Sequence, residues 1–388
     1  LNDLTYLYRY GAYITKDELG IASYLNQMEE SKIQAMADTY TEGYRIGFVL
    51  GGKDLSIKDT VCVEYPIGFE RMVRAAIRNF EKMDLKPTIY REAVSSFTNR
   101  GNSKRGCYSV SPNKQYDYDH KSDRAFYLDK AFVERRLETL KTAYEAHKEQ
   151  AYGHAGPAVI EVFGEAPFAP VNKKEAKQYS EKQNQLNVYH ASQSGQITNQ
   201  YIKGEERSFT IIAYPIPSIG DKFKEIFAET VKINTLDYKL YQEMQQKIID
   251  VLDTAEYVEV IGKGENRTNM QVRLAALSDP EKQTKFENCV ADVNIPLGEV
   301  FTSPKLAGTN GILNVGTVYI GDIQYRNLLM EFKDGRVVSA VCDNFAENGE
   351  IDKEAGHRLI VQGIMNGHEI LPLGEFAIGT NTTAYAVA

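Results

Sequence analysis

Two glutamates that each follow a glycine are the residues of this sequence best suited to chemistry. Glu299 lies in NIPLGEVFTSP, residues 294–304, and Glu375 lies in LPLGEFAIGTN, residues 371–381. In both stretches an apolar run leads to a glycine, the acid and a second apolar run, so each acid is expected at a bend next to a strand. A lone acid at such a bend is usually solvated. Two of them on one rigid sheet would instead supply the paired carboxylates that a two-metal site or an acid–base pair needs.

The densest cluster of other potential metal ligands contains Asp117, Asp119, His120 and Asp123. Tyrosines interleave with these residues in a polar context that is typical of a loop. A site for a hard cation needs six or more converging oxygens, which one short loop rarely provides. We therefore expect these side chains to be solvated rather than bound to a metal.

Several well-known motifs are incomplete in this sequence. Residues 47–53, GFVLGGK, have the spacing of a phosphate-binding loop, but Asp54 stands where Ser or Thr is needed, and the next segment predicts a strand instead of a helix. His357 and His368 lie in the same region as the two Gly-Glu corners, yet the HExxH spacing of a thermolysin-type zinc site is absent. No nucleophile elbow or Cys/His nucleophile pattern is visible, which disfavours nucleophilic catalysis.

Composition places the chain among soluble globular proteins and argues against several partners. The 388 residues are enough for two or three domains, and 43% hydrophobic residues with 25% charged residues is ordinary for this class. A net charge of -8 without a Lys/Arg block argues against nucleic acid or an anionic membrane as a partner. No apolar run approaches the roughly 20 residues of a membrane span, and no signal peptide opens the chain. With four widely spaced cysteines, we expect a cytoplasmic protein with reduced thiols.

Strands that alternate with helices fill residues 46–235 and predict an open, mostly parallel sheet with helices on both faces, an N-terminal α/β domain. The first unit is the clearest, because apolar residues from 69 to 83 recur at helical spacing between a strand at 61–65 and another at 88–90. The further elements expected here are helices at 129–150 and 173–201 and strands at 158–163 and 208–214.

Residues 236–388 predict a different, mixed α+β domain. It opens with a helix at 238–253, whose inner stripe is expected to consist of Tyr241, Met244, Ile248, Ile249 and Leu252. The strongest hairpin signal of the chain is Asp334-Gly335, which joins the expected strands 328–332 and 336–341. The other elements expected here are strands at 257–261, 270–274, 290–295, 312–320 and 370–378 and a helix at 350–365.

Both ends of the chain have features of a fragment. It starts at Leu1 without an initiator methionine, and residues 1–45 already have a tyrosine-rich, near-helical pattern. We interpret these residues as the helical remnant of an N-terminal extension, which packs on the α/β domain after it or on a preceding part of the protein. Thr380 and Asn381 predict the start of a helix, and the chain stops at Ala388 before that helix ends. We therefore expect truncation at both ends and an incomplete second domain.

The two Gly-Glu corners together are specific enough to name a family. GEVFTSP at 298–304, with Asn294 before it, and LGEFAIGTN at 373–381 closely resemble the two acidic signatures of the thermophilic metalloaminopeptidases of the AmpS/PepS/AmpT type. The preceding α/β region and the FTIIAYP strand at 209–215 are also similar to that family. The resemblance covers residues 46–388, and the residues before it look like the tail of an extra region in longer, clostridial-like members.

The resemblance implies an aminopeptidase that releases N-terminal residues from peptides with a co-catalytic pair of divalent metal ions. Glu299 and Glu375 would be metal ligands, and the ions are expected to be zinc or cobalt, with magnesium or manganese as alternatives. The family's remaining ligands, two histidines and an aspartate, and its catalytic tyrosine lie downstream of the second signature. They are expected beyond Ala388, so the resemblance implies no catalytic residue within the chain and an inactive fragment. Its expected partners are peptides with a free N-terminus and a second copy of the chain in a homodimer.

A second hypothesis is a non-catalytic α/β binding or assembly module in which Glu299 and Glu375 only form hydrogen bonds with nearby backbone. The two hypotheses differ in geometry. A dinuclear site requires both carboxyl groups to face one cleft within about 5 to 8 Å of each other. Carboxylates on opposite faces of the sheet would favour the module.

Overall fold

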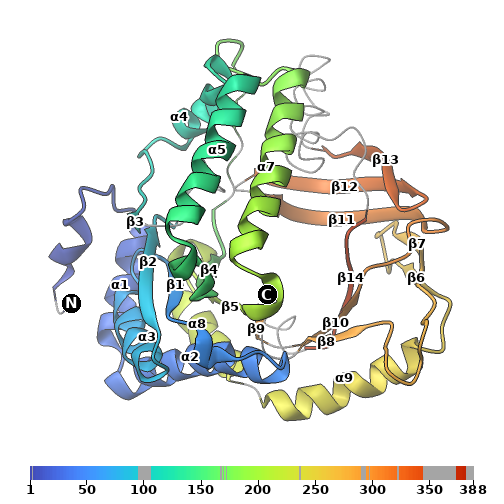
Figure 1. Cartoon of the computed structure of the whole chain (residues 1–388), viewed down its shortest axis with the longest axis horizontal. Coiled ribbons are helices and arrows are strands. Elements are labelled where there is room, and N and C mark those ends of the chain that lie inside the picture. The colour runs from blue at the N-terminus through green and yellow to red at the C-terminus, as the bar shows by residue number, and fades with distance from the viewer. Residues whose placement is uncertain are drawn as a thin grey trace.

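A computed structural model of the chain describes residues 1, 3–94, 106–166, 168, 170, 171, 173–235, 237–289, 294–296, 298–320, 323–343 and 373–381. Figure 1 shows a parallel sheet with its helices in the N-terminal half and antiparallel sheets in the C-terminal half. The helix predicted at 350–365 and the helix start predicted after Asn381 lie outside the described residues. Among the helices of the described ranges, none is long and apolar enough to cross a membrane.

The N-terminal half is built on a six-stranded sheet in which all neighbouring strands are parallel. The strand order is β3-β2-β1-β4-β5-β9. The first strand, β1, lies inside the sheet; β2 and β3 are added on one side of it, and β4, β5 and β9 are then added on the other side. This order confirms the predicted open parallel sheet. The strands are β1 (Thr60–Pro66), β2 (Lys86–Glu92), β3 (Gly106–Cys107), β4 (His154–Phe163), β5 (Thr210–Pro215) and β9 (Asn294–Ile295).

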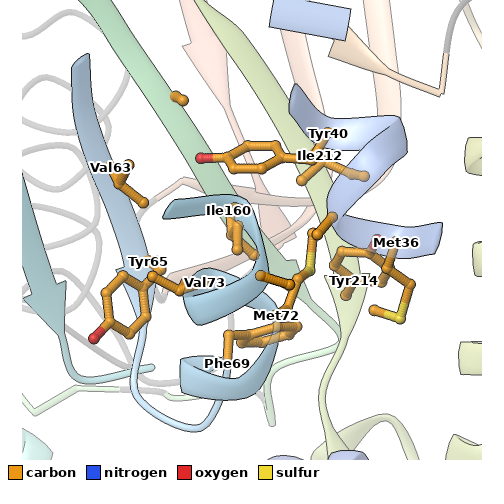
Figure 2. Packing of buried hydrophobic residues seen from close by; sticks show 14 of the residues in the cluster. Met36, Tyr40, Val63, Tyr65, Phe69, Met72, Val73, Ile160, Ile212 and Tyr214 are labelled. Carbon is orange, nitrogen blue, oxygen red and sulfur yellow. The ribbon is translucent and has the colours of Figure 1, made fainter. Parts of the chain in front are cut away.

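The largest hydrophobic core of the described residues lies between one face of this sheet and the helices that cover it. Alternate residues of the strands, such as Val63 on β1 and Ile212 on β5, point to this face. Figure 2 shows them packed against side chains of the covering helices, including Met36, Tyr40 and Met72, and against Phe69 just before α3. The helices are α1 (Lys16–Gln27), α2 (Glu30–Leu50), α3 (Glu70–Lys82) and α8 (Phe223–Asn234).

Residues 1–45 are not separate from this sheet. The boundary predicted between residues 45 and 46 falls inside α2, and Tyr40 and Tyr44 of that helix are fully buried in the sheet core. Arg71 of α3 fastens the end of α1 to the same core, because its guanidinium donates to the carbonyl oxygens of Leu25 and Met28. Helices α1 and α2 are therefore part of the α/β core.

The two helices predicted after the first βαβ unit form a parallel pair, with different bounds from those expected. The first is interrupted at His147, and the second begins at Glu181 because Ser180 and Gln183 form a capping box there. Tyr144 and Tyr201, near the C-terminal ends of the two helices, stack with their ring centroids 4.9 Å apart, and Figure 1 shows the helices side by side. The helices of this segment are α4 (Lys114–His120), α5 (Lys130–Ala146), α6 (Lys148–Tyr152) and α7 (Glu181–Tyr201).

A five-stranded antiparallel sheet of order β13-β12-β11-β7-β6 dominates the C-terminal half. The hairpin predicted at Asp334-Gly335 is confirmed, since both residues have positive φ angles, 45° and 67°, as a two-residue turn between β12 and β13 requires. The strands are β6 (Tyr257–Ile261), β7 (Asn269–Arg273), β11 (Asn310–Ile320), β12 (Ile323–Lys333) and β13 (Arg336–Val341). Short 3-10 helices lie at Leu4–Tyr8, Leu55–Ile57, Asp123–Phe126, Gly204–Glu206 and Pro217–Ile219.

Helix α9 (Tyr238–Leu252) covers a smaller, three-stranded antiparallel sheet of order β14-β10-β8. Ile248, Ile249 and Leu252 pack onto this sheet as predicted. The predicted inner stripe is wrong at one position: Met244 is 47% exposed, and its neighbour Gln245 is fully buried instead. The strands are β8 (Glu287–Cys289), β10 (Glu299–Thr302) and β14 (Phe376–Gly379).

One segment joins the two halves of the molecule. The boundary predicted between residues 235 and 236 falls between α8 and α9, but β9 returns to the parallel sheet and pairs with β5. Ile295 of β9 is buried in the core of the parallel sheet, and Val300 of β10 is buried in the core beneath α9. The strand predicted at 290–295 is thus described only at its end, because residues 290–293 lie outside the described ranges.

Candidate metal centre

Glu299 is the first residue of β10, and the backbone before it is fixed by glycine. Gly298 has a φ of +138°, and a Cβ atom added there would lie 2.5 Å from the Cβ of Asn381. Only glycine satisfies both the positive φ and this close approach. The backbone N–H of Thr380 donates to the carbonyl oxygen of Gly298 at 2.6 Å, so the start of β10 is fastened to the end of β14.

The alternation of side chains along β10 directs Glu299 away from the hydrophobic core. Val300 is fully buried beneath α9, and Thr302 on the same face is also buried. Glu299 and Phe301 occupy the opposite face, where both are half-buried. The Glu299 carboxylate is therefore on the side of the sheet that faces away from α9.

Glu375 lies on the same face as Glu299. In the antiparallel register Glu299 is opposite Gly379, and Thr302 is opposite Phe376. Residues that are directly opposite share a face and side chains alternate, so Glu375, the residue before β14, falls on the face of Gly379 and Glu299. The offset of four residues along the strand separates the two Cα atoms by about 14 Å. One metal cluster could contact both carboxylates only if the two side chains extend toward each other.

The residues around Glu375 anchor it to both antiparallel sheets. Leu373 packs against the core of the five-stranded sheet, and its N–H donates to the carbonyl oxygen of Gly335 at 2.6 Å. Phe376 contacts that core and also the core beneath α9, where its ring meets Phe286 edge to face. Glu375 itself is exposed. Its backbone is thus held by packing on either side while its carboxylate stays accessible.

A buried glutamine of α9 holds together the three strands at the level of Glu299. Gln245 Nε2 donates to the side-chain oxygen of Asn288 at 2.7 Å and to the carbonyl oxygen of Cys289 at 3.1 Å, both on β8. Its Oε1 accepts a hydrogen bond of 2.9 Å from the hydroxyl of Thr380 at the end of β14. Cys289 is the residue opposite Glu299. The sequence pattern missed Gln245, because a polar residue next to an apolar stripe predicts a solvent-facing position.

The acidic cluster at 117–123 forms protein contacts instead of a metal site. Its first residues lie on α4 and not in a loop. Lys173 Nζ lies 2.6 Å from Asp119, and His120 Nδ1 lies 2.7 Å from Asp123. Burial alone would raise the pKa of Asp119, but hydrogen bonds that include the one from Lys173 hold it below its ordinary value. Within the described ranges, no group of three or more His, Cys, Asp or Glu residues could hold a metal ion.

Residues 47–53 do not form a phosphate-binding loop. They comprise the last turn of α2 and the turn after it, so the loop follows a helix instead of preceding one. Lys53 Nζ donates to the carbonyl oxygen of Arg207 at 2.8 Å. The only positively charged side chain of the motif is therefore engaged in a contact within the protein. The expectation that this stretch binds no nucleotide agrees with this geometry.

The part of the chain that contains both glutamates matches a known family. The model of the thermophilic metalloprotease (M29) family matches residues 109–384, more than two thirds of the chain. The chain belongs to this family. The family resemblance seen in the two Gly-Glu corners is thereby confirmed, and as an M29 protein the chain is a peptidase of the metal-dependent kind.

Among solved structures, wild-type AmpT from Thermus thermophilus is similar to this M29 chain. The two are 15% identical, the match covers 89% of this chain and 78% of that chain, and the TM-score is 0.45. A search of curated proteins finds no match.

The donors of this M29 protein fit part of a divalent metal site. Carboxylate oxygens are suitable ligands for zinc and for harder divalent ions. A zinc ion in a catalytic site takes about three protein ligands, so two glutamates are too few for two ions. His357 and His368, the histidines nearest in sequence to the second corner, lie outside the described residues.

Proposed function

We propose that this M29 chain carries the glutamate half of a two-metal aminopeptidase site, which releases N-terminal residues from peptides. The observation that supports the proposal is the common face of Glu299 and Glu375 on β10 and β14, within the segment that matches the family. When bound, the two divalent ions would polarise the scissile carbonyl and activate a water molecule at neutral pH. Zinc or cobalt are the ions we propose first, with magnesium or manganese as alternatives, in a cytoplasmic enzyme.

The chain's own residues would position the ligands. Gly298 and Thr380 fix the backbone at Glu299, and Leu373 and Phe376 fix it at Glu375. Ligands on adjacent, hydrogen-bonded strands keep their spacing better than ligands on loops do, and metal affinity depends on this spacing. We propose that the remaining ligands, two histidines and an aspartate, and the catalytic tyrosine come from sequence beyond Ala388. The 388 residues alone would then bind metal weakly and lack activity.

The proposal is tested with the natural full-length gene product, loaded with zinc or cobalt. We expect it to hydrolyse aminoacyl-anilides and peptides with a free N-terminus, and to leave the same peptides intact when the N-terminus is acetylated. Cleavage should stop when a chelator removes the metal and return when the metal is added back. A protein that binds no divalent metal and cleaves no substrate with a free amine would contradict the proposal.

The alternative function, a non-catalytic binding or assembly module, is not favoured by the register of β10 and β14. That hypothesis is favoured by carboxylates on opposite faces of the sheet, and the register assigns Glu299 and Glu375 to one face. Direct measurement of the distance between the two carboxylates in a metal-loaded crystal would decide the matter. A separation beyond the reach of a shared two-metal cluster, more than about 8 Å, would restore the module hypothesis.

A further inference from the structure

Helices α5 and α7 bring together positively charged side chains from three segments of the chain. Arg124 lies in the 3-10 helix before α5, Arg136 on α5 and His190 on α7. All three side chains are half-buried. The imidazole of His190 interacts electrostatically with both guanidinium groups, and the two guanidinium groups interact with each other. We call these three residues the α5–α7 cationic cluster.

The three segments are held in place by contacts at both ends of the helix pair. At the N-terminal end of α7, Gln183 Nε2 donates to the carbonyl oxygens of Ala125 at 2.8 Å and Leu128 at 3.0 Å, in and just after the 3-10 helix before α5. At the other end of the pair, the rings of Tyr144 and Tyr201 stack. Figure 1 shows α5 and α7 side by side between these contacts. The spacing of the cationic side chains is therefore set by the fold.

An aromatic ring supports the guanidinium group of Arg136. The guanidinium carbon lies 5.9 Å from the centre of the Phe132 ring, one turn earlier on α5, and that ring packs edge to face on Tyr127. A cation held over the face of a ring is oriented without the use of its hydrogen-bond donors. Among the described residues, no carboxylate lies close enough to Arg136 to form an ion pair. The N–H groups of this guanidinium can therefore bind a ligand.

The cluster has an electrostatic cost that a bound anion would remove. Burial and the neighbouring charge of Arg124 lower the pKa of Arg136. Burial, Arg136 and Arg124, in that order, lower the pKa of His190. The charged forms are disfavoured because like charges repel and half-buried charges lose part of their hydration. An anion between the three groups would replace this repulsion by attraction.

Two acidic residues next to the cluster in sequence have other partners. Asp123, beside Arg124, lies 2.7 Å from His120 Nδ1. Asp129 accepts a hydrogen bond of 2.7 Å from the backbone N–H of Phe132 at the start of α5. The chain as a whole has a net charge of -8, so the cluster is a local reversal of its charge. A local concentration of positive charge attracts anions even on an acidic protein.

We propose that the α5–α7 cationic cluster binds a phosphoryl group, as free phosphate or as part of a small phosphate ester. The two guanidinium groups supply two permanent positive charges, which match the charge of about -1.5 to -2 on a phosphoryl group at neutral pH. Their planar N–H forks fit its oxygens, and the imidazole adds a third donor. A carboxylate has one charge and two oxygens, so it would leave part of the cluster without a partner. The site depends neither on bound metal nor on the proposed peptidase activity.

The first experiment is isothermal titration calorimetry with inorganic phosphate at low salt, after the purified chain has passed over a chelating resin that removes metal ions. We expect one phosphate per chain with a dissociation constant of about 1 mM or lower. Acetate should bind at least tenfold more weakly. Phosphoserine in place of phosphate identifies the source: equal or tighter binding assigns the site to a phosphate ester, and weaker binding assigns it to the free ion. No saturable phosphate binding, or acetate as tight as phosphate, would overturn the proposal.

The second experiment repeats the titration with variants of the cluster. Arg136→Gln should weaken phosphate binding at least tenfold, because it removes a charge and a donor fork, and Arg136→Lys should weaken it less, since only the fork is lost. The matched control is Arg135→Gln, at the exposed neighbouring arginine, which should bind phosphate as the wild type does. Thermal unfolding shows whether each variant is folded. A folded Arg136→Gln protein with wild-type affinity, or an equal loss in Arg135→Gln, would show that phosphate does not bind at the cluster.

NMR of the wild-type chain locates the bound phosphate directly. The imidazole signals of His190, assigned from the spectrum of His190→Gln, should shift saturably with the dissociation constant that calorimetry gives. The signals of His147, which is exposed at the C-terminal end of α5, should stay in place. Phosphate binding that leaves the His190 signals unchanged would place the site elsewhere and rule out the cluster.

Discussion

Gly298 and Gly374 precede the two glutamates, yet the backbone requires glycine at only one of them. Gly298 has a positive φ and lies against Asn381, two residues after the end of β14. Gly374 has no positive φ, and the space around it is open to an added Cβ. Two corners that look alike in the sequence therefore have different local structures, and only the first is a close contact between strands.

The difference between the glycines predicts different costs for the same substitution. Gly298→Ala should destabilise the protein by about 1 to 3 kcal/mol, because alanine must adopt a positive φ and overlap with Asn381. Gly374→Ala is the matched control and should be neutral or slightly stabilising, since it reduces the entropy of the unfolded chain without a clash. Urea unfolding measures both changes. Equal free energies of unfolding for the two variants would show that the Gly298 contact does not exist in solution.

Substitution of Glu299 is expected to change metal binding without changing the stability of the fold. Glu299→Gln should change the free energy of unfolding by less than about 0.5 kcal/mol, because the side chain is half-buried and lies on the face of the sheet opposite the core beneath α9. In the full-length gene product it should lower metal affinity at least tenfold, because it removes a charged ligand. Calorimetric zinc titration and thermal unfolding measure the two effects. Glu287→Gln, on the neighbouring strand β8, is the control that should change neither.

At the scale of elements, α9 illustrates how a helix is oriented by the sheet it covers. Its sequence has apolar residues on two sides, and the predicted inner stripe assigned Met244 to the core. Gln245 takes the interior position because three polar groups at the edges of β8 and β14 need hydrogen-bond partners there. The rotation that satisfies them leaves Met244 on the outer face.

The hydrogen bonds of Gln245 predict that its replacement by an apolar residue of similar size lowers the free energy of unfolding substantially. Gln245→Leu should destabilise the protein by about 1 to 3 kcal/mol, because it leaves the buried carbonyl oxygen of Cys289 and the half-buried polar groups of Asn288 and Thr380 without this partner. Gln246→Leu is the matched control and should have little effect, since Gln246 is exposed, donates to Asp250 of the same helix and accepts a long hydrogen bond from Asn288. Thermal and urea unfolding compare the two variants. A Gln245→Leu protein as stable as the wild type would show that the three strands do not depend on α9 for their alignment.

At the scale of the whole molecule, the stretch from Asn294 to Thr302 connects the parallel sheet to the three-stranded sheet and also contains a candidate metal ligand. Its first residues complete the parallel sheet and its last residues form the centre of the three-stranded sheet. Ile295 is 6% exposed and would be only 2.9 Å from a Cβ atom added at Gly43 of α2. Glu299 is therefore positioned by the cores of both halves of the chain.

This connection predicts that a cavity in the parallel sheet also destabilises the three-stranded sheet. Ile295→Ala should destabilise the protein by about 2 to 5 kcal/mol, because it removes a buried side chain at a closely packed contact. Hydrogen exchange should increase in β10 as well as in the parallel sheet, since β9 leads directly into β10. Ile261→Ala, at a side chain that is 69% exposed, should cost less than about 0.5 kcal/mol. Faster exchange confined to the parallel sheet would show that the two halves unfold independently.

The sequence by itself determined the fold class, most element positions and the family. The βαβ periodicity, the Asp334-Gly335 turn and the two Gly-Glu corners are local signals, because hydrophobic spacing and turn conformation depend on residues close together in the chain. Glu299 and Glu375 could be selected for the same reason. What the sequence could not determine was where residues 1–45 pack or which side of α9 is buried.

Only the tertiary structure decided how distant segments meet. The register of β10 and β14 assigns both glutamates to one face, and it depends on pairing between segments more than 70 residues apart. The burial of Gln245, the insertion of β9 beside β5 and the packing of α2 in the sheet core likewise depend on partners from elsewhere in the chain. Local patterns carry no information about such partners, because a strand or helix with the same spacing can pack in several registers.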